Sequence, residues 1–485
     1  MTSEGTYPYF RGGVSTWTHN LIKKLPDIEF YIVSIVPSPF FRISYDLPKN
    51  VRGLVTIPLW GEEQPGEHFS PSCLSVLRRV IRTGTSEVEE EFIPSFKDFL
   101  EEVLSGGKNP RRMGEALTSM RKFFEDHDYK KTFKSEALWK LYISKLGEDK
   151  LYSNMEVSEL IDLARVLQHF LRVLIFPFPE GDVYHSSAAA LCGVPAIVSK
   201  VKEDIPYLLT EHGLYFRERI LDTVRLVKSL PAKIFWLNLF RAIVLANYNY
   251  ADKISPVCSF NVNWEREFGI KEGKIEVIYN GIDVNRFRPL NVRRDEDVKR
   301  IILMARVDKL KGIIDMVEAF SYVKEEVRNA VCQVFGPIVD KEYYAACMRK
   351  VKELGLEDSF LFMGPTNQPE VEYNRADVVA LPSISEGFPY AVVEAMACGR
   401  LVVATDVGGV REALEGCGIV VPPRQPRELG KAISEALLDE EMRKELGMKA
   451  REKAVRLYSE ERFLADYLRS YVELLSEKKI GGMSK

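Results

Sequence analysis

The chain has 485 residues, of which 46% are hydrophobic and 28% are charged, and its formal net charge is −3. This length is too great for one hydrophobic core, so we expect at least two domains. The near-neutral balance excludes the global basic field of many nucleic-acid-binding proteins, and we expect no nucleic-acid partner.

The apolar and cysteine patterns favour a cytoplasmic protein. No apolar run reaches 18 uninterrupted residues, and the richest, 234–246, contains Asn238 and Arg241, which argues against a membrane span. The N-terminus lacks a signal-peptide pattern. The seven cysteines form no C-x-x-C pair, so we expect buried thiols in a reducing compartment. These patterns are also compatible with peripheral association of the protein with the inner face of a membrane.

Residues 1 to about 60, and again from about 180, alternate short apolar runs with helical patterns. The runs are rich in β-branched and aromatic residues, which predicts a parallel α/β sheet. The predicted strands are 30–36, 51–57, 182–184, 196–199 and 207–210.

Between about 61 and 178 the sequence is charged and helical in pattern, and we predict a helical insertion in the first domain. Apolar residues recur every three or four positions from Phe96 to Leu104, and Gly106 with Gly107 ends that helix. The spacing of leucines between 160 and 174 predicts another helix.

From about residue 280 strands and helices alternate regularly, which predicts a second doubly wound domain. The predicted strands are 300–305, 330–335, 360–363, 378–381 and 401–404, and the predicted helices are 312–323, 341–354, 390–397 and 427–438. Amphipathic helices follow at 440–456 and 460–477.

We therefore expect an α/β protein of two Rossmann-like domains facing a cleft, where a ligand binds. The first domain spans 1–280 and includes the insertion, and the second, which would bind the donor, spans 281–460. Residues 461–485 are predicted to pack back on the first domain.

Two carboxylates, Glu386 and Glu394, flank a loop that follows the predicted strand 378–381. Gly387, Phe388 and Pro389 form the loop, and a helix is predicted to start at Tyr390. Such a loop gathers an acid, backbone N–H groups and a helix N-terminus around one small volume. This arrangement suits a ligand with both hydroxyls and phosphates, such as a nucleotide sugar.

Basic and glycine residues follow other strands. Arg306 and Lys311 come directly after the strand 301–305 and could grip a diphosphate from two sides, although a solvated helix start has the same pattern. Gly12 and Gly13 precede a helical pattern and would let backbone approach a phosphate or sugar, although a plain turn also explains them.

His185 and His212 each close a predicted strand, 182–184 and 207–209, so both would face the same cleft; a structural hydrogen-bonding role is the alternative. The turn at 280–283, Asn-Gly-Ile-Asp, is interpreted as a link between the domains. The Asp-x-Asp triplets at 126–128 and 295–297 are interpreted as solvated surface, and we expect no metal.

Taken together, Glu386-x7-Glu394, the basic pair Arg306 and Lys311, and the 280–283 turn resemble the landmarks of glycosyltransferase family 4, retaining nucleotide-sugar transferases with the GT-B fold. The segments 4–15 and 209–215 and the helical insertion are similar to the subgroup of the Pel exopolysaccharide glycosyltransferase. The resemblance covers nearly the whole chain, more loosely over 61–178.

The resemblance implies roles for these residues. Arg306 and Lys311 would bind the donor diphosphate, Glu394 the ribose hydroxyls, and Glu386 the transferred sugar. The backbone of the loop formed by Gly387, Phe388, Pro389 and Tyr390 would lie near that sugar, with His212 beside it. Gly13 and His185 complete the expected donor-binding set.

The resemblance also implies UDP-glucose as donor, no metal or other cofactor, and front-face transfer with retention, in which the leaving phosphate helps deprotonate the acceptor. The acceptor would be a sugar, polysaccharide or lipid, and a membrane-associated synthase is a further possible partner. A disaccharide synthase or phosphorylase of the same fold, and a catalytically silent nucleotide-sugar-binding subunit, are the alternatives.

The chain departs from the family pattern in two places. Only three residues precede Glu4, so most of the family's opening strand is expected to be missing. Many family members have His-x-His where this chain has His185-Ser-Ser, which shifts the expected sugar-binding role to His212.

Overall fold

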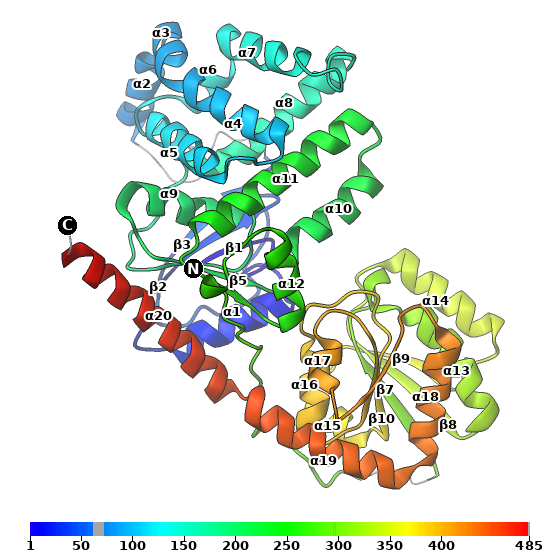
Figure 1. The fold of residues 1–485 in the computed structure, drawn as a ribbon. Helices are drawn as coiled ribbons and strands as arrows, with labels where there is room; N and C mark the ends of the chain where they lie inside the picture. The colour runs from blue at the N-terminus through cyan, green and yellow to red at the C-terminus, as the bar shows by residue number, and fades with distance from the viewer. Residues whose placement is uncertain (62–71, 294, 296, 484–485) are drawn as a thin grey trace. The chain divides into compact units, whose positions relative to one another are not determined.

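The computed structural model describes residues 1–61, 72–293, 295 and 297–483. The chain forms two compact units. The first contains Met1–Pro256, Trp264–Glu276 and the residues from Leu468 onward, and the second contains Val257–Asn263 and Val277–Tyr467. Each unit contains one six-stranded sheet (Figure 1).

The sheet of the first unit has the order β3-β2-β1-β4-β5-β6, and all its pairings are parallel. Two strands, β2 and β3, therefore lie on one side of β1, and the strands β4, β5 and β6 lie on the other, so the order reverses between β1 and β4. The strands are β1 (Thr2–Glu4), β2 (Phe30–Val36), β3 (Val51–Pro58), β4 (Tyr184–Ser186), β5 (Tyr207–Glu211) and β6 (Lys253–Pro256).

An opening strand of three residues is present, where the sequence predicts that most of the family's strand is missing. β1 has only three residues, yet it lies at the centre of the sheet and pairs with both β2 and β4. The amino group of Met1 donates a hydrogen bond to the carbonyl of Tyr31 at 2.9 Å, and the Ser3 hydroxyl donates to the Tyr7 carbonyl at 2.7 Å. The strand is therefore short, but the sheet has kept its central element.

The predicted strand 196–199 is wrong, because these residues lie in the helix α9 (Val194–Glu203). Its first half is buried on every side, so the apolar run carries no helical periodicity, and a short buried run does not distinguish strand from helix. Pro195 at the start of the helix suits its first turn, where no backbone N–H is needed.

The described part of the insertion between β3 and β4, from residue 72 onward, is helical, as predicted. An aromatic core holds it together, with Phe92, Phe96, Phe99, Phe123 and Phe124 all buried. Gly106 adopts the left-handed conformation that ends α4, which confirms the predicted stop. The helices are α2 (Cys73–Arg82), α3 (Thr85–Glu87), η2 (Val88–Phe92), α4 (Ile93–Ser105), α5 (Pro110–Asp126), α6 (Tyr129–Phe133), α7 (Glu136–Gly147), α8 (Val157–Leu171) and η3 (Arg172–Ile175).

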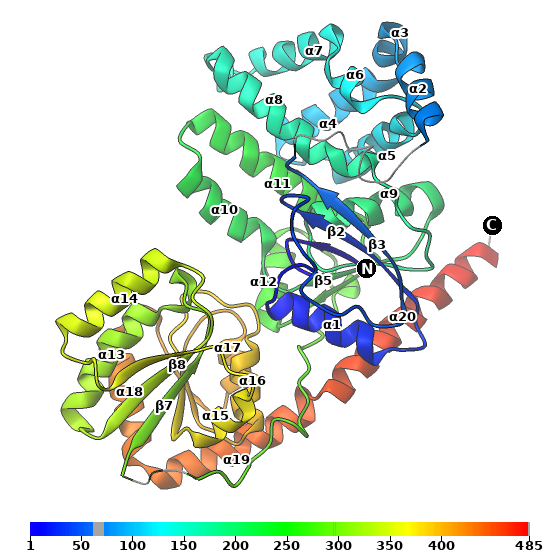
Figure 2. The ribbon, with the colours of Figure 1, turned by 180° about the vertical axis from the view of Figure 1, so that it is seen from behind.

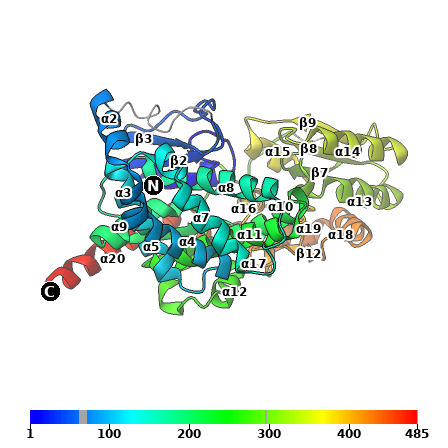
Figure 3. The ribbon, with the colours of Figure 1, turned by 90° about the horizontal axis from the view of Figure 1, so that it is seen from above.

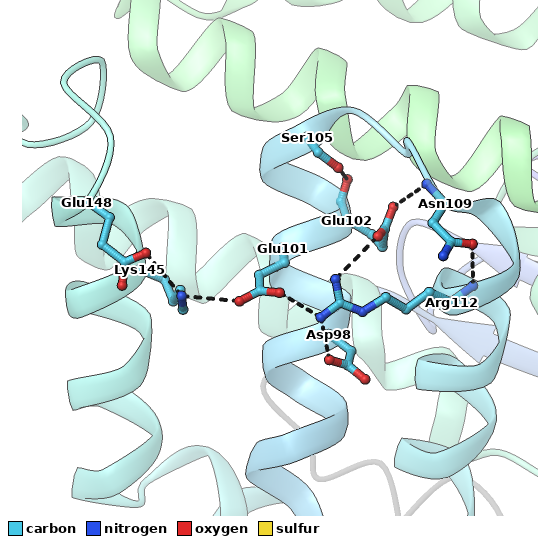
Figure 4. A network of polar contacts seen from close by, with 8 residues as sticks. All are labelled: Asp98, Glu101, Glu102, Ser105, Asn109, Arg112, Lys145 and Glu148. Carbon is cyan, nitrogen blue, oxygen red and sulfur yellow. Dashed lines mark hydrogen bonds and ion pairs between the residues drawn. The ribbon is translucent and has the colours of Figure 1, made fainter.

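A polar network joins three helices of the insertion (Figure 4). Arg112 of α5 donates hydrogen bonds of 2.6 Å to both Asp98 and Glu101 of α4. Lys145 of α7 pairs with the other oxygen of Glu101 at 3.1 Å. One shared carboxylate thus fixes the lateral positions of α4, α5 and α7.

The apolar run 234–246 lies in α11 (Leu230–Tyr250), a helix that crosses from the insertion to the sheet. The polar residues that interrupt the run bind the end of α4: Asn238 donates to the carbonyl of Leu104 at 3.2 Å, and Arg241 donates to that of Gly106. In the described part of the chain no helix is both long and apolar enough to cross a membrane.

The remaining helices of the first unit surround its sheet (Figure 2). They are α1 (Gly13–Lys24), η4 (Leu191–Gly193), α9, α10 (Tyr215–Leu226), α11, α12 (Ser259–Glu267), which is shared with the second unit, and η5 (Glu272–Lys274). The last helix, α20 (Glu460–Met483), belongs to this unit from Leu468 onward. There Glu473 forms an ion pair with Lys253 of β6.

The sheet of the second unit repeats the same order, β9-β8-β7-β10-β11-β12, again with parallel pairings. The order reverses between β7 and β10. The strands are β7 (Lys299–Met304), β8 (Ala330–Phe335), β9 (Phe360–Gly364), β10 (Val378–Leu381), β11 (Val402–Thr405) and β12 (Ile419–Val421). The predicted strands 330–335 and 378–381 are confirmed to the residue.

Two hydrophobic clusters cover the two faces of this sheet, so that helices lie on both sides (Figures 1 and 2). One face carries α13 (Ile313–Glu326), α14 (Lys341–Glu353) and α18 (Pro426–Leu438). The other carries α15 (Pro369–Arg375), α16 (Tyr390–Ala397), α17 (Val410–Leu414) and α19 (Glu440–Leu457). The predicted α/β class with two doubly wound sheets is confirmed.

Candidate functional site

The loops after β7 and β10 meet where the strand order of the second sheet reverses, the position at which open α/β sheets bind ligands. The backbone N–H of Ile384 donates to the carbonyl of Leu310 at 2.8 Å. Gly312 has φ +61°, and a Cβ there would lie 2.1 Å from the carbonyl oxygen of Pro382. This close approach brings the two predicted motifs, far apart in sequence, into one place.

An ion pair joins the two loops. The Lys311 ammonium lies 2.6 Å from Oε1 of Glu386, and the Ser383 hydroxyl donates to the same oxygen at 2.6 Å. The side chains of Lys311 and Glu386 are only 19% and 9% exposed. Because both partners are largely removed from water and share a third polar group, their orientation is well determined.

A third loop, which follows β11 and contains Gly408 and Gly409, packs against the Glu386 loop. Gly408 has φ +56°, and a Cβ there would lie 2.0 Å from the carbonyl oxygen of Glu386. The next residue, Gly409, donates its backbone N–H to the Gly387 carbonyl at 2.7 Å. Asn280 of the predicted linking turn donates to the Phe388 carbonyl at 3.0 Å. The turn therefore positions the candidate site as well as linking segments.

Phe388 supports the loop with its side chain. The ring is 4% exposed and packs against Tyr279 and Tyr458, with ring centroids 5.3 and 5.1 Å away. Any contact of Phe388 with a ligand would therefore come from its backbone. Pro389 precedes the first residue of α16, and Tyr390 is half-buried at the start of that helix.

Arg306 lies at the carboxyl end of β7, where the sequence predicts it, and its side chain is exposed. Its guanidinium pairs with Asp308 of the same loop at 3.3 Å. Asp308 also accepts a hydrogen bond from the backbone N–H of Leu310 at 3.0 Å. The guanidinium is therefore loosely held beside a rigid turn, in contrast to the enclosed ammonium of Lys311.

Glu394 lies in the second turn of α16, and its carboxylate accepts a hydrogen bond of 2.9 Å from the hydroxyl of Tyr373. Burial raises the pKa of Glu394 to about 7, although the Tyr373 hydrogen bond and the nearby charge of Arg286 act in the opposite direction. The side chain can therefore change its charge near neutral pH.

In the first unit, Gly13 is the first residue of α1 and is exposed. The helix follows the loop that leaves β1, so its N-terminus lies beyond the carboxyl end of that strand. This is the position the sequence predicts for a backbone that approaches a phosphate.

The two histidines have different environments, although Trp17 lies against both, with ring centroids 5.5 Å from His185 and 4.5 Å from His212. His212 follows β5, and its buried Nε2 has no hydrogen-bond partner among the residues that the structure describes. Burial lowers the pKa of His212 to about 3, so the imidazole is neutral.

His185 has a structural environment instead. Its Nδ1 lies 2.7 Å from the hydroxyl of Tyr471 in α20, and its Nε2 lies 2.8 Å from that of Thr210 in β5. It lies within β4 rather than at its end, and it is 2% exposed. Both ring nitrogens of His185, which the sequence predicts in the donor-binding set, thus have hydrogen-bond partners within the protein.

Ser383 and Tyr373 were not among the predicted site residues. Ser383 has a local signal, since it lies three residues before Glu386 in the same loop. Tyr373 has no such signal in the sequence, because α15 meets α16 only in the folded unit.

The triplet at 126–128 has structural roles: Asp126 pairs with Arg82, and Asp128 caps α6. Among the described residues, no group of three His, Cys, Asp or Glu side chains could hold a metal.

Two family models match the chain. The model described as "Domain of unknown function (DUF3492)" matches residues 1–273. The model described as "Glycosyl transferases group 1" matches residues 288–453. The second match contains Lys311, Ser383 and Glu386.

Curated relatives match in part. N-acetyl-alpha-D-glucosaminyl L-malate synthase of Bacillus anthracis is 26% identical over 240 residues, which are 48% of this chain and 62% of the relative. A diphospho-undecaprenol alpha-1,3-N-acetylgalactosaminyltransferase of Campylobacter jejuni is 28% identical over 255 residues, 49% of this chain and 65% of the relative. The chain thus spans less than two thirds of the length of these relatives.

Solved structures share the fold over nearly the whole chain. Sucrose-phosphate synthase from Thermosynechococcus elongatus superposes with a TM-score of 0.61 at 18% identity, covering 98% of this chain and 99% of that one. HepE of Anabaena, solved in complex with UDP-glucose, has a TM-score of 0.57 at 15% identity, covering 98% and 100%. The fold is that of GT-B glycosyltransferases, which confirms the predicted fold class. Since its model matches more than half of the residues, the chain belongs to the family described as Domain of unknown function (DUF3492), and its second unit carries a glycosyl transferases group 1 domain.

Proposed function

We propose that the protein is a retaining hexosyltransferase that moves glucose from UDP-glucose to a sugar, polysaccharide or lipid acceptor. The observation that carries this proposal is the enclosed Lys311–Glu386 pair, with Ser383, at the point where the second sheet reverses its order. The group 1 match over these residues and the family 4 resemblance support it. The shared fold of HepE, a protein solved with UDP-glucose, is consistent with it.

In this proposal Lys311 and Arg306 neutralise the diphosphate. As the bond between sugar and phosphate breaks, negative charge grows on the leaving UDP, and fixed cations at that position are the main source of rate enhancement. Lys311 is already oriented by Glu386 and Ser383, so little reorganisation is needed. Arg306 is more loosely held and closes on the donor after binding.

Glu386 would bind the transferred sugar through the carboxylate oxygen that faces away from Lys311. His212 is neutral, so it can exchange a hydrogen bond with a sugar hydroxyl without adding charge. Glu394 would accept hydrogen bonds from the ribose hydroxyls in its ionised form.

The transfer is proposed to occur on one face of the sugar. The bond from the anomeric carbon to the phosphate oxygen breaks, and a bond from that carbon to the acceptor oxygen forms on the same side. The proton of the acceptor hydroxyl passes to the leaving phosphate, and UDP is released. We propose no metal for this step, because Arg306 and Lys311 supply the positive charge.

We further propose that the reaction serves exopolysaccharide synthesis on the cytoplasmic side of a membrane, next to a membrane-bound synthase. The relative from Campylobacter jejuni is named for a lipid-linked substrate, which keeps a lipid acceptor among the candidates.

The test is UDP release from a panel of UDP-sugars, measured with and without sugar and lipid acceptors and analysed by mass spectrometry. We expect slow hydrolysis of UDP-glucose alone and faster release with the correct acceptor, both unaffected by EDTA. Turnover with free glucose or inorganic phosphate as acceptor would identify a disaccharide synthase or phosphorylase. Binding of UDP-glucose without release of UDP under any condition would identify a silent subunit instead.

A further inference from the structure

Three segments of the second unit hold the loop that carries Glu386. Gly409 donates its backbone N–H to a carbonyl of this loop, and the side chain of Asn280 donates to another. The third contact comes from Cys258, a fully buried residue whose thiol donates to the carbonyl of Gly387 at 3.7 Å. The position of the loop backbone therefore depends on all three segments.

Two of these segments also bind one carboxylate, that of Glu412 in α17. Ser259 directly follows Cys258, and it donates twice to Glu412, from its backbone N–H at 2.8 Å and from its hydroxyl at 2.6 Å. Tyr279 directly precedes Asn280, and its hydroxyl donates to Glu412 as well. A single side chain thus joins the two segments, and each segment contacts the loop through the neighbouring residue.

The bonds to Glu412 come from well-defined donors. Burial, together with the hydrogen bond to Glu412, raises the pKa of Tyr279 to about 12, so its hydroxyl keeps the proton and donates. Hydrogen bonds that end on a carboxylate are shorter and stronger than those between neutral groups. The three bonds therefore fix Ser259 and Tyr279 relative to α17.

Glu412 is itself supported. Lys453 of α19 donates to the backbone carbonyls of Glu412 and Glu415 at 2.8 and 3.2 Å, which fixes the end of α17. The helix α17 lies beside α16, which follows the Glu386 loop, and the two helices share one hydrophobic cluster (Figures 1 and 3). The carboxylate therefore projects from a helix whose place in the unit is set by packing.

Close packing transmits a displacement of these segments to the loop. Gly409 directly precedes α17, and a Cβ there would lie 2.7 Å from the Cβ of Cys258 and 2.8 Å from the ring of Phe388. The ring of Tyr279 lies against that of Phe388, with the centroids 5.3 Å apart. Densely packed groups leave little room for one to move alone, so these residues shift together.

We propose that Glu412 is a positioning residue, which holds the Glu386 loop in the place where it binds the transferred sugar. It acts through Ser259 and Tyr279, whose sequence neighbours contact the backbone of the loop. This inference rests on the proposed function, because that function assigns the loop to the sugar. The diphosphate is assigned to another loop, that of Lys311, so loss of Glu412 should slow the reaction of the sugar and leave the affinity for UDP nearly unchanged.

The experiment compares Glu412→Ala with the matched control Glu415→Ala. Glu415 carries the same charge and follows directly on α17 with an exposed side chain, and its alanine variant keeps the carbonyl that binds Lys453. Initial rates of UDP-glucose hydrolysis give kcat, and calorimetric titration with UDP gives its Kd. We expect Glu412→Ala to lower kcat by about 10- to 100-fold and to change the Kd of UDP by less than about twofold. The control should change neither.

Two further variants separate positioning from stability. Glu412→Gln keeps the shape of the side chain and one acceptor oxygen, so it should recover part of the lost rate. Ser259→Ala with Tyr279→Phe removes the two hydroxyl donors and leaves Glu412 in place, and it should also lower kcat. Adding Glu412→Ala to this pair should lower kcat by less than about threefold more, because residues in one network do not act additively. The pair also tests the proposal if Glu412→Ala does not fold.

Hydrogen–deuterium exchange of the ligand-free protein tests the position of the loop without turnover. We expect faster exchange in the segment 384–390 in Glu412→Ala and unchanged exchange in Glu415→Ala. If the wild type releases no UDP, the proposed function fails, while this measurement still decides whether Glu412 holds the loop.

Three results would overturn the proposal. The first is unchanged exchange of the loop in Glu412→Ala. The second is an equal loss of kcat in the two alanine variants. The third is a loss of UDP affinity as large as the loss of kcat, which would show general damage to the second unit.

Discussion

The two sheets have the same strand order but use their central strands differently. In the second unit the loops after the central strands β7 and β10 hold Lys311 and Glu386 in a charged pair. In the first unit Glu4 ends the central strand β1 and accepts a hydrogen bond of 3.1 Å from Tyr215. Burial raises the pKa of Glu4, and the charge of Arg219 only partly opposes this.

The difference shows that the strand order sets where a ligand can bind, whereas the loops after the central strands provide the side chains that would bind it. A reversal of strand order creates an opening beyond the sheet in either unit. In the second unit the loops bring a lysine and a glutamate together with closely packed glycines. The first unit instead offers a neutral imidazole, His212, and an exposed helix start at Gly13.

The largest expected effect tests the chemistry of the second unit. Lys311→Ala removes the cation that we place at the leaving diphosphate, and UDP release should fall by about 100- to 1000-fold. Lys309→Ala is the control, since Lys309 lies in the same short helix with an exposed side chain. Equal rates for the two variants would remove Lys311 from the mechanism.

The next effect tests the close packing of the loops. Gly408→Ala adds a Cβ that would lie 2.0 Å from the Glu386 carbonyl oxygen, so the loop must move. Since a displacement of about 1 Å can cost on the order of 100-fold in rate, we expect a loss of 10- to 100-fold. Gly416→Ala is the matched control, because Gly416 also has positive φ but has open space around it. If Gly408→Ala keeps full activity, the position of the Glu386 loop does not determine the rate of UDP release.

Substitutions of His185 and His212 test which of the two histidines in the first unit supports the fold and which contacts the donor. His185→Ala removes two buried hydrogen bonds and should lower the free energy of unfolding by about 2–4 kcal/mol, with the KM for UDP-glucose unchanged. His212→Ala removes no hydrogen bond to the described residues, so it should lower the melting temperature less than His185→Ala does and raise that KM by about two- to tenfold. Calorimetric melting and initial rates measure both. The opposite pattern would restore His185 to the donor site.

The smallest effect is the pH dependence of donor binding. Glu394 has a pKa of about 7, and its ionised form would bind the ribose, so the KM for the donor should rise as pH falls below about 7. Glu394→Gln should flatten this profile, and a profile unchanged in that variant would exclude the ribose role. For stability the sign is opposite: the raised pKa contributes stability that is present below the usual carboxyl pKa and is lost as pH rises through 7. Glu265 has a similar pKa, so KM is the more specific measurement.

The sequence predicts much of the second unit because short buried strands alternate there with amphipathic helices. Strands 330–335 and 378–381 and helix 390–397 agree with the structure to the residue. The motif residues occur at strand ends, which topology brings together whatever the intervening sequence. The partners of the motif are harder to predict, because the contact of Tyr373 with Glu394 depends on how two helices pack.

The first unit shows where local patterns fail. The run 196–199 is buried on every side, so its helical period is hidden and a buried helix resembles a strand. His185 lies at an expected strand end only if the strand stops at residue 184, and the observed strand runs to Ser186. A shift of two residues thus places His185 inside the strand, where its ring nitrogens lie among buried hydroxyl groups.

Hydrogen–deuterium exchange measured by mass spectrometry with and without UDP tests the central claim most directly. If the second unit binds the nucleotide at its strand reversal, UDP should slow exchange in the segments 306–312 and 384–394, and Lys311→Ala should abolish this protection. Protection confined to the segments of the first unit, or unchanged protection in Lys311→Ala, would contradict the account.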